Sequence, residues 1–282
     1  MLFRSVVRRE FRLVEGDAFN SAKLRRSRQR VQNLDFFDKV TVDQVPGSAP
    51  DRTVVKVGVQ EKSTGALTVG VGYSTLNGPL VETGIRERNL LGRGQDIRLS
   101  GAVSGRRTTV NFGFTEPYFM DREVAAGFDA FHIRTDQQRQ SSFNSTVTGM
   151  NLRAGYPITE NLSQRWVYTV KETEVTNIKS NASLYVKSQE GNHILSQIAH
   201  ILTYDRRDSA VNPTEGYVLK TQQDVAGIGG DSQFIRNTLE GAQYWPYWED
   251  WVLSVRAKTG YILGFGKDVR LTERFFLGGD DI

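Results

Sequence analysis

A long series of segments in which apolar residues alternate with small or polar ones is the feature that most constrains the fold of this chain. In GALTVGVGYST, residues 65–75, one side carries Leu67, Val69, Val71 and Tyr73, and the other carries Ala66, Thr68, Gly70 and Gly72. Successive side chains of a β-strand point to opposite faces, so this segment predicts a strand with one apolar and one nearly bare face. We interpret the apolar face as lipid-facing and the bare face as lining a wide, wet interior.

Eleven strands of this kind are predicted from Gly65 onward. Their ranges are roughly 65–75, 79–91, 94–104, 107–118, 123–135, 145–157, 164–176, 195–206, 216–227, 232–246 and 251–264. Most are longer than the about 5–6 residues of a globular strand, and they suit tilted strands that cross about 30 Å of hydrocarbon. The predicted fold class is therefore a transmembrane antiparallel β-barrel. A soluble β-sandwich or a lipocalin-like barrel is the alternative, although Gly, Asn, Arg and Thr at the inward positions would leave a soluble core without apolar bulk.

Several classes of function lack their usual residues. The longest uncharged stretches contain His, Ser and Gln and stay short of the about 18 apolar residues that a membrane-spanning helix needs. The chain has no cysteine, and its three histidines, His132, His193 and His200, are scattered, so we expect no metal site and no cofactor. A P-loop and a G-x-S-x-G nucleophile motif are also missing from the sequence, and we expect the protein not to be an enzyme.

Residues 1–63 differ from the rest in charge, with 13 Lys/Arg against 8 Asp/Glu, whereas the remainder has 23 against 24. Helical spacing of apolar residues predicts one helix in VVRREFRLVEGD, ending at Gly16, and a second from an N-cap at Ser21 to about Asn33. FFDKVTVDQV and TVVKVGVQEK then predict two strands joined by PGSAPD. We interpret the basic run KLRRSRQR, residues 23–30, as a solvated helix face, or one facing anionic lipid or a protein partner, rather than a nucleic-acid site.

Six motifs, taken in order, resemble the BamA family, the central component of outer-membrane β-barrel assembly in Gram-negative bacteria. They are RRSRQRVQNLDFFDKVTVDQVPGS, QEKSTGALTVGVGYST, LLGRGQDIRLS, FTEPYF, TYDRRDSAVNPTEGYVLKT and RFFLGGDDI. The resemblance implies that residues 1–63 are the last periplasmic POTRA domain, without its first strand. Residues 64–282 are then the N-terminal part of an outer-membrane barrel of sixteen implied strands, ending in the sixth extracellular loop. Family members continue beyond this point with Arg-Gly-Phe, so we expect the chain to be a fragment of a longer protein.

The resemblance also implies a function, the insertion and folding of other β-barrel proteins. A strand that enters a membrane needs a partner for its backbone groups, and a weak edge on the first barrel strand supplies one. The implied seam residues are Leu67, Val69, Gly70, Val71, Gly72 and Tyr73. Glycines at the inward positions reduce packing and weaken the register of such a strand.

Two further sets of residues follow from the resemblance. Arg8, Arg9, Arg12 and Glu15 are the implied docking residues for an accessory lipoprotein of the BamD type, and Gly278, Gly279, Asp280, Asp281 and Ile282 are the implied tip of a loop that folds back into the barrel. The expected partners are unfolded barrel clients, such lipoproteins and the lipid bilayer, with no nucleic acid. The alternative is a two-partner secretion pore or a TamA-like translocation protein, and a plain diffusion porin is disfavoured by the α/β segment before the barrel.

Overall fold

The structure is a computed structural model, and it describes residues 4–50, 52–75, 77–139, 141–210, 212–248 and 251–275. The chain divides into two compact units. The first comprises Met1–Leu67 together with Ile85–Ile97, and the second comprises Thr68–Gly84 together with Arg98–Ile282. In the described residues, no helix is both long enough and apolar enough to cross a bilayer.

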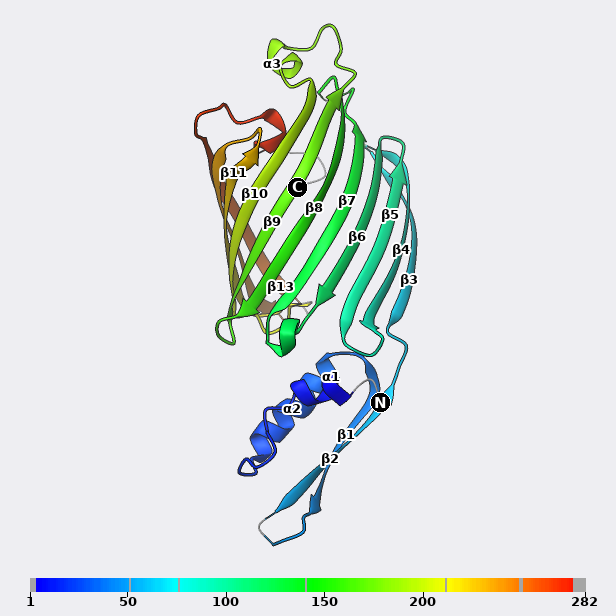
Figure 1. The fold of residues 1–282 in the computed structure, drawn as a ribbon, viewed down its shortest axis with the longest axis vertical. Helices are drawn as coiled ribbons and strands as arrows, with labels where there is room; N and C mark the ends of the chain where they lie inside the picture. The colour runs from blue at the N-terminus through cyan, green and yellow to red at the C-terminus, as the bar shows by residue number, and fades with distance from the viewer. Residues whose placement is uncertain are drawn as a thin grey trace. The chain divides into compact units, whose positions relative to one another are not determined.

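The N-terminal part of the first unit has the predicted order of two helices followed by two strands. These elements are α1 (Arg4–Arg9), α2 (Ser21–Asn33), β1 (Phe37–Pro46) and β2 (Thr53–Glu61). The two strands pair antiparallel, and the helices cover them (Figure 1). The apolar core comprises Val6, Val31, Phe36, Phe37 and Val40. Removal of these side chains from water is what holds this small unit together.

The boundaries of both helices differ from the sequence prediction. Helix α1 ends at Arg9 rather than continuing to Gly16, because the backbone N–H of Arg12 donates to Ser27 Oγ on α2, at 2.8 Å, instead of continuing the helical ladder. The N-cap of α2 is Asn20 and not Ser21: its side chain accepts hydrogen bonds from two backbone N–H groups of the first turn. Both corrections come from hydrogen bonds that helical spacing alone does not reveal.

Eleven strands follow and form one sheet within the described residues. They are β3 (Gly65–Ser74), β4 (Gly78–Leu90), β5 (Gln95–Ser104), β6 (Arg107–Glu116), β7 (Ala125–Asp136), β8 (Asn144–Pro157), β9 (Leu162–Thr176), β10 (Gly191–Asp205), β11 (Gly216–Gly230), β12 (Phe234–Trp248) and β13 (Trp251–Gly264). Each strand lies beside its neighbour in sequence, so that β3 and β13 are the two ends of the sheet. The sheet curls, and β13 passes behind β8 and β9 in the view of Figure 1.

The two faces of the sheet carry different side chains, as the alternation predicts. Phe128 on β7 pairs with Leu152 on β8, and both are substantially exposed. The next residue on each strand, Asp129 and Arg153, points to the opposite face, where the two side chains form an ion pair. On this opposite face, Arg153 pairs with Val167 on β9, Val167 with Ala199 on β10, and Ala199 with Asp224 on β11. Asp224 is fully buried. We call the face that carries Arg153 and Asp224 the inner face, and the one that carries Phe128 and Leu152 the outer face.

The connections do not sort cleanly by length between the two ends of the sheet. The longest described one runs from residue 177 to 190 and contains the short helix α3 (Leu184–Lys187), at the top in Figure 1. A ten-residue connection, 206–215, lies at the opposite end of the sheet. Two short 3₁₀ turns complete the described elements, η1 (Phe119–Asp121) and η2 (Leu271–Glu273).

Candidate functional site

Strand β3 is the terminal strand of the sheet and the site of the predicted seam. Among the described strands it lies beside β4 alone, just as β13, at the other end of the sheet, lies beside β12 alone. The outer-face residues of β3 are the most exposed apolar row among the described strands: Leu67 (72%), Val69 (70%), Val71 (83%) and Tyr73 (77%). A strand with this exposure needs an apolar environment around its side chains and a hydrogen-bonding partner along its free edge.

The inner face of β3 is shaped by its glycines in two different ways. A Cβ built at Gly70 would lie 2.6 Å from Oε1 of Glu82 on β4, whereas a Cβ at Gly72 would meet nothing within 4 Å. Gly70 therefore makes room for an inward carboxylate, and Gly72 leaves open space. Neither glycine has a side chain that could pack against the neighbouring strand β4.

The four residues implied to dock a lipoprotein lie in α1 and directly after it, but they are not equivalent. Arg8 Nη2 and Glu15 Oε1 form an ion pair at 3.1 Å, with both side chains largely exposed, and the Arg12 side chain is also exposed. The Arg9 guanidinium instead donates to the backbone carbonyl of Arg93 at 3.2 Å. Arg8, Arg12 and Glu15 are thus available on the surface of the first unit, while Arg9 is engaged within that unit.

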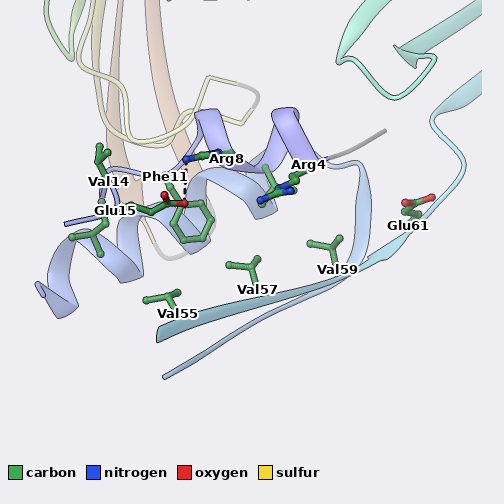
Figure 2. A pocket seen from close by; sticks show the side chains of 11 residues that line it. Arg4, Arg8, Phe11, Val14, Glu15, Val55, Val57, Val59 and Glu61 are labelled. Atoms are coloured by element: carbon green, nitrogen blue, oxygen red, sulfur yellow. Dashed lines mark hydrogen bonds and ion pairs between the residues drawn. The ribbon is translucent and has the colours of Figure 1, made fainter. Parts of the chain in front are cut away.

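An apolar groove runs along β2 beside these residues. Its volume is about 690 Å³, and Val55, Val57 and Val59 form its floor, facing Phe11 (Figure 2). Arg8 and Glu15 lie at the same groove, joined by their ion pair in Figure 2. Among the described residues, β2 pairs with β1.

Sequence reasoning missed an ion-pair ladder on the inner face. Asp129 accepts from Arg153 Nε at 2.8 Å and from Arg98 Nη2 at 2.9 Å, so one carboxylate links β5, β7 and β8. A Cβ at Gly113, on the intervening strand β6, would lie 2.6 Å from Arg98 Nε and 2.8 Å from Asp129 Oδ1. The signal was present as charged residues at alternate positions, but only the register brings them together.

A second charged cluster on the inner face joins three strands to the chain segment that follows β13. Its members are Lys171 on β9, Asp224 on β11, Arg236 on β12 and Glu273 in η2. Asp224 and Glu273 are almost completely buried, at 0% and 5% exposed. The predicted loop tip, Gly278, Gly279, Asp280, Asp281 and Ile282, lies outside the described residues.

An antiparallel sheet with long strands, an apolar outer face and charged pairs inside, preceded by a small α/β unit, defines a class of protein: a transmembrane β-barrel protein with an N-terminal α/β domain. The chain belongs to the Omp85 superfamily, whose domain profile matches residues 89–282. The profile of the POTRA domain, described as a surface antigen variable number repeat, matches residues 2–62. Membership of this superfamily places the chain among outer-membrane proteins, and the predicted fold class is confirmed.

Individual relatives and solved structures show which members of the superfamily this chain resembles. The chain is 37% identical over 281 residues to the outer membrane protein assembly factor BamA of Nitratidesulfovibrio vulgaris, covering 98% of this chain and 35% of that protein. The chain thus spans about a third of the length of this relative. Among solved structures, BamA from Haemophilus ducreyi lacking POTRA domains 1–3 matches with a TM-score of 0.80 at 22% identity, covering 98% of this chain and 56% of that one. CdiB from Acinetobacter baumannii matches with a TM-score of 0.59 at 14% identity, covering 98% and 53%. The two structures show a shared fold, and the predicted resemblance to the BamA family is confirmed.

Proposed function

We propose that this chain is part of an outer-membrane assembly factor that inserts and folds β-barrel proteins. Residues 64–282 form the N-terminal part of its barrel, and residues 1–63 form its last POTRA domain, in the periplasm. The proposal is supported by the 37% identity to a protein named as such a factor. It is carried by one structural observation, the bare inner face of β3, where Gly70 makes room for Glu82 and a Cβ at Gly72 would meet nothing within 4 Å.

The physical role of the β3 edge follows from the cost of unpaired backbone groups in hydrocarbon. Each buried N–H or C=O without a partner costs several kcal/mol, about 2–7 by transfer measurements. A client strand that pairs with β3 crosses the membrane with its backbone groups bonded. Because Gly70 and Gly72 hold β3 only weakly to a neighbour, the edge exchanges one partner strand for another. The reaction needs no chemical step, and we propose no enzymatic activity and no cofactor.

The proposed partners are unfolded barrel clients, the lipid bilayer and an accessory lipoprotein of the BamD type. For the lipoprotein we propose the exposed surface formed by Arg8, Arg12 and Glu15, with Arg9 placing α1 from within the unit. Opposite charges on one small surface favour a partner that presents both signs. The role of residues 278–282 as the loop tip remains a prediction from the resemblance.

Depletion of the full-length protein tests the proposed function. We expect the amounts of many outer-membrane barrels to fall together, because each needs the same edge for insertion. Loss of export of a single exoprotein, with other barrels unchanged, would instead favour the two-partner secretion or TamA-like alternative. That alternative is weaker, since a relative 37% identical to this chain is named an assembly factor and the CdiB likeness concerns the fold.

Cysteine crosslinking tests the seam. Val69→Cys or Val71→Cys in the full-length protein should crosslink to a cysteine in the terminal strand of a stalled client. Leu152→Cys is the matched control, because it is also on the outer face but belongs to β8, which is paired on both sides. Equal crosslinking at all three positions, or none at the two β3 positions, would contradict the proposal that client strands pair with β3.

A further inference from the structure

The segment that follows β13 returns to the inner face of the sheet and makes three kinds of contact there. We call residues 269–275 the return segment. Val269 packs against the buried cluster of Leu195, Ala226 and Phe234, and a Cβ at Gly260 would lie 2.7 Å from the Phe275 ring. These contacts place the ends of the return segment against β10, β11, β12 and β13.

Between these apolar contacts lies a single buried carboxylate. Glu273 is 5% exposed, and its Oε1 lies 2.9 Å from Lys171 Nζ on β9. Its backbone carbonyl accepts from Arg236 Nη1 at 3.5 Å. Arg236 is itself fixed, because its Nε donates to the fully buried Asp224 at 2.7 Å. Two cations from different strands therefore converge on one residue of the return segment.

Helix α3 contacts the same segment through a different set of atoms. The Tyr185 hydroxyl donates to the carbonyl of Val269 at 3.2 Å, and the Arg274 guanidinium lies over the Tyr185 ring at 5.1 Å. Arg274 Nε also donates to the Val269 carbonyl, at 3.0 Å. These contacts hold the backbone before and after Glu273, so that its carboxylate faces the inner face of the sheet.

We propose that Lys171, Arg236 and Asp224 form a docking site for Glu273, and that Glu273 is the positioning residue that locks the return segment to the inner face. A carboxylate this deeply buried is tolerated only when it is paired, so docking and ion pairing are one event. The lock fixes the point from which the chain continues after Phe275. It rests on contacts within the second unit and does not depend on the proposed function.

The test measures how often the return segment leaves the inner face of the sheet. Thr272→Cys introduces a single cysteine into the full-length protein, which is purified in detergent micelles. The rate at which a water-soluble maleimide labels this cysteine is then measured. Leu184→Cys, at a position 85% exposed, gives the rate of a fully accessible site. Adding Glu273→Gln to Thr272→Cys should raise the labelling rate at least about tenfold, because the neutral amide loses the ion pair with Lys171, while the contact of Arg236 with the backbone carbonyl is retained.

Three further variants separate the lock from a general loosening of the segment. Asp268→Asn makes the same chemical change at an exposed carboxylate five residues earlier and should leave the rate unchanged. Lys171→Met alone should raise the rate, and Lys171→Met with Glu273→Gln should raise it no further, because the two side chains act as one pair. Additive effects, an unchanged rate in Glu273→Gln, or an equal rise in Asp268→Asn would each overturn the proposal.

Discussion

The side chain of Glu82 on β4 occupies the space in which a side chain at Gly70 on β3 would lie. A Cβ at Gly70 would approach Glu82 Oε1 to 2.6 Å and Glu82 Cγ to 2.8 Å. Gly72, two residues along the same face, has nothing within 4 Å of the equivalent position. The two glycines look alike in the sequence, but only one of them accommodates a neighbour.

Gly70→Ala should therefore destabilise the contact between β3 and β4, and Gly72→Ala should not. Because Glu82 must move away from a new methyl group, we expect Gly70→Ala to lower the free energy of unfolding by about 1–3 kcal/mol. Gly72→Ala should change it by less than about 0.5 kcal/mol. Urea unfolding of the full-length protein in lipid vesicles measures both.

Removing the neighbour tests the cause of this difference. In a Glu82→Ala background the cost of Gly70→Ala should disappear, because the space is then empty. If the cost of Gly70→Ala were the same with and without Glu82, the close approach would not be its origin.

The inner-face ladder offers a second matched pair, since Arg98 and Arg153 bind the same carboxylate of Asp129. Arg153 also donates to Thr115 Oγ1 at 2.9 Å and to the Phe114 carbonyl at 3.2 Å, and its side chain is 21% exposed against 48% for Arg98. Arg153→Gln should cost about 1.5–3 kcal/mol of unfolding free energy, and Arg98→Gln about 1 kcal/mol or less. Equal costs in urea unfolding would contradict the difference in burial.

The sheet was predictable from sequence because its outer face has one strong requirement. Outer-face positions must be apolar, so alternation alone placed eleven strands, and the range 251–264 predicted for the last strand agrees with β13 (Trp251–Gly264). Other boundaries moved by a few residues where polar ends continue the ladder, as at Gly191 of β10, predicted to begin at 195. Short polar extensions pair as well as apolar ones and leave no periodic signal.

The contacts inside the sheet were not predictable, because they depend on register between strands far apart in sequence. Lys171 and Glu273 are both ordinary charged residues in the sequence, and each looks solvated when read alone. Their pairing requires β9 and the chain after β13 to meet on the same face. The helix α3 was missed for another reason: four residues, Leu184–Lys187, are too few to show a helical period.

The corrected N-cap of α2 predicts a difference between two neighbouring residues. Asn20 Oδ1 accepts from the backbone N–H groups of Ala22 and Lys23, both at 3.0 Å, so Asn20→Ala should destabilise the first turn by about 0.5–2 kcal/mol. Ser21→Ala should be neutral or slightly stabilising, since alanine is the better helix former. Amide hydrogen exchange of Ala22 to Leu24 in the intact protein measures the effect. A larger loss of protection in Ser21→Ala would restore Ser21 as the cap.

Asp208, in the connection between β10 and β11, predicts a pH dependence. The Thr214 hydroxyl donates to Asp208 Oδ2 at 2.5 Å, and backbone N–H groups of Thr214 and Glu215 donate to Oδ1. These hydrogen bonds lower the pKa of Asp208 from 3.8 to about 2, with the Thr214 hydroxyl as the largest cause and the backbone N–H groups next. A lowered pKa means that the carboxylate stabilises this connection fully above about pH 4, and that the contribution is lost as the pH falls toward 2.

A carboxyl-carbon NMR titration of the full-length protein, labelled at aspartate, measures this midpoint. The wild-type midpoint should lie at about 2. Thr214→Val removes the hydroxyl donor and should raise the pKa of Asp208 toward its ordinary value, whereas Thr214→Ser keeps a hydroxyl and should leave the midpoint nearly unchanged. Because both substitutions retain the backbone N–H donors, a rise shared by the two would assign the lowered pKa to the shape of the connection and not to the Thr214 hydroxyl.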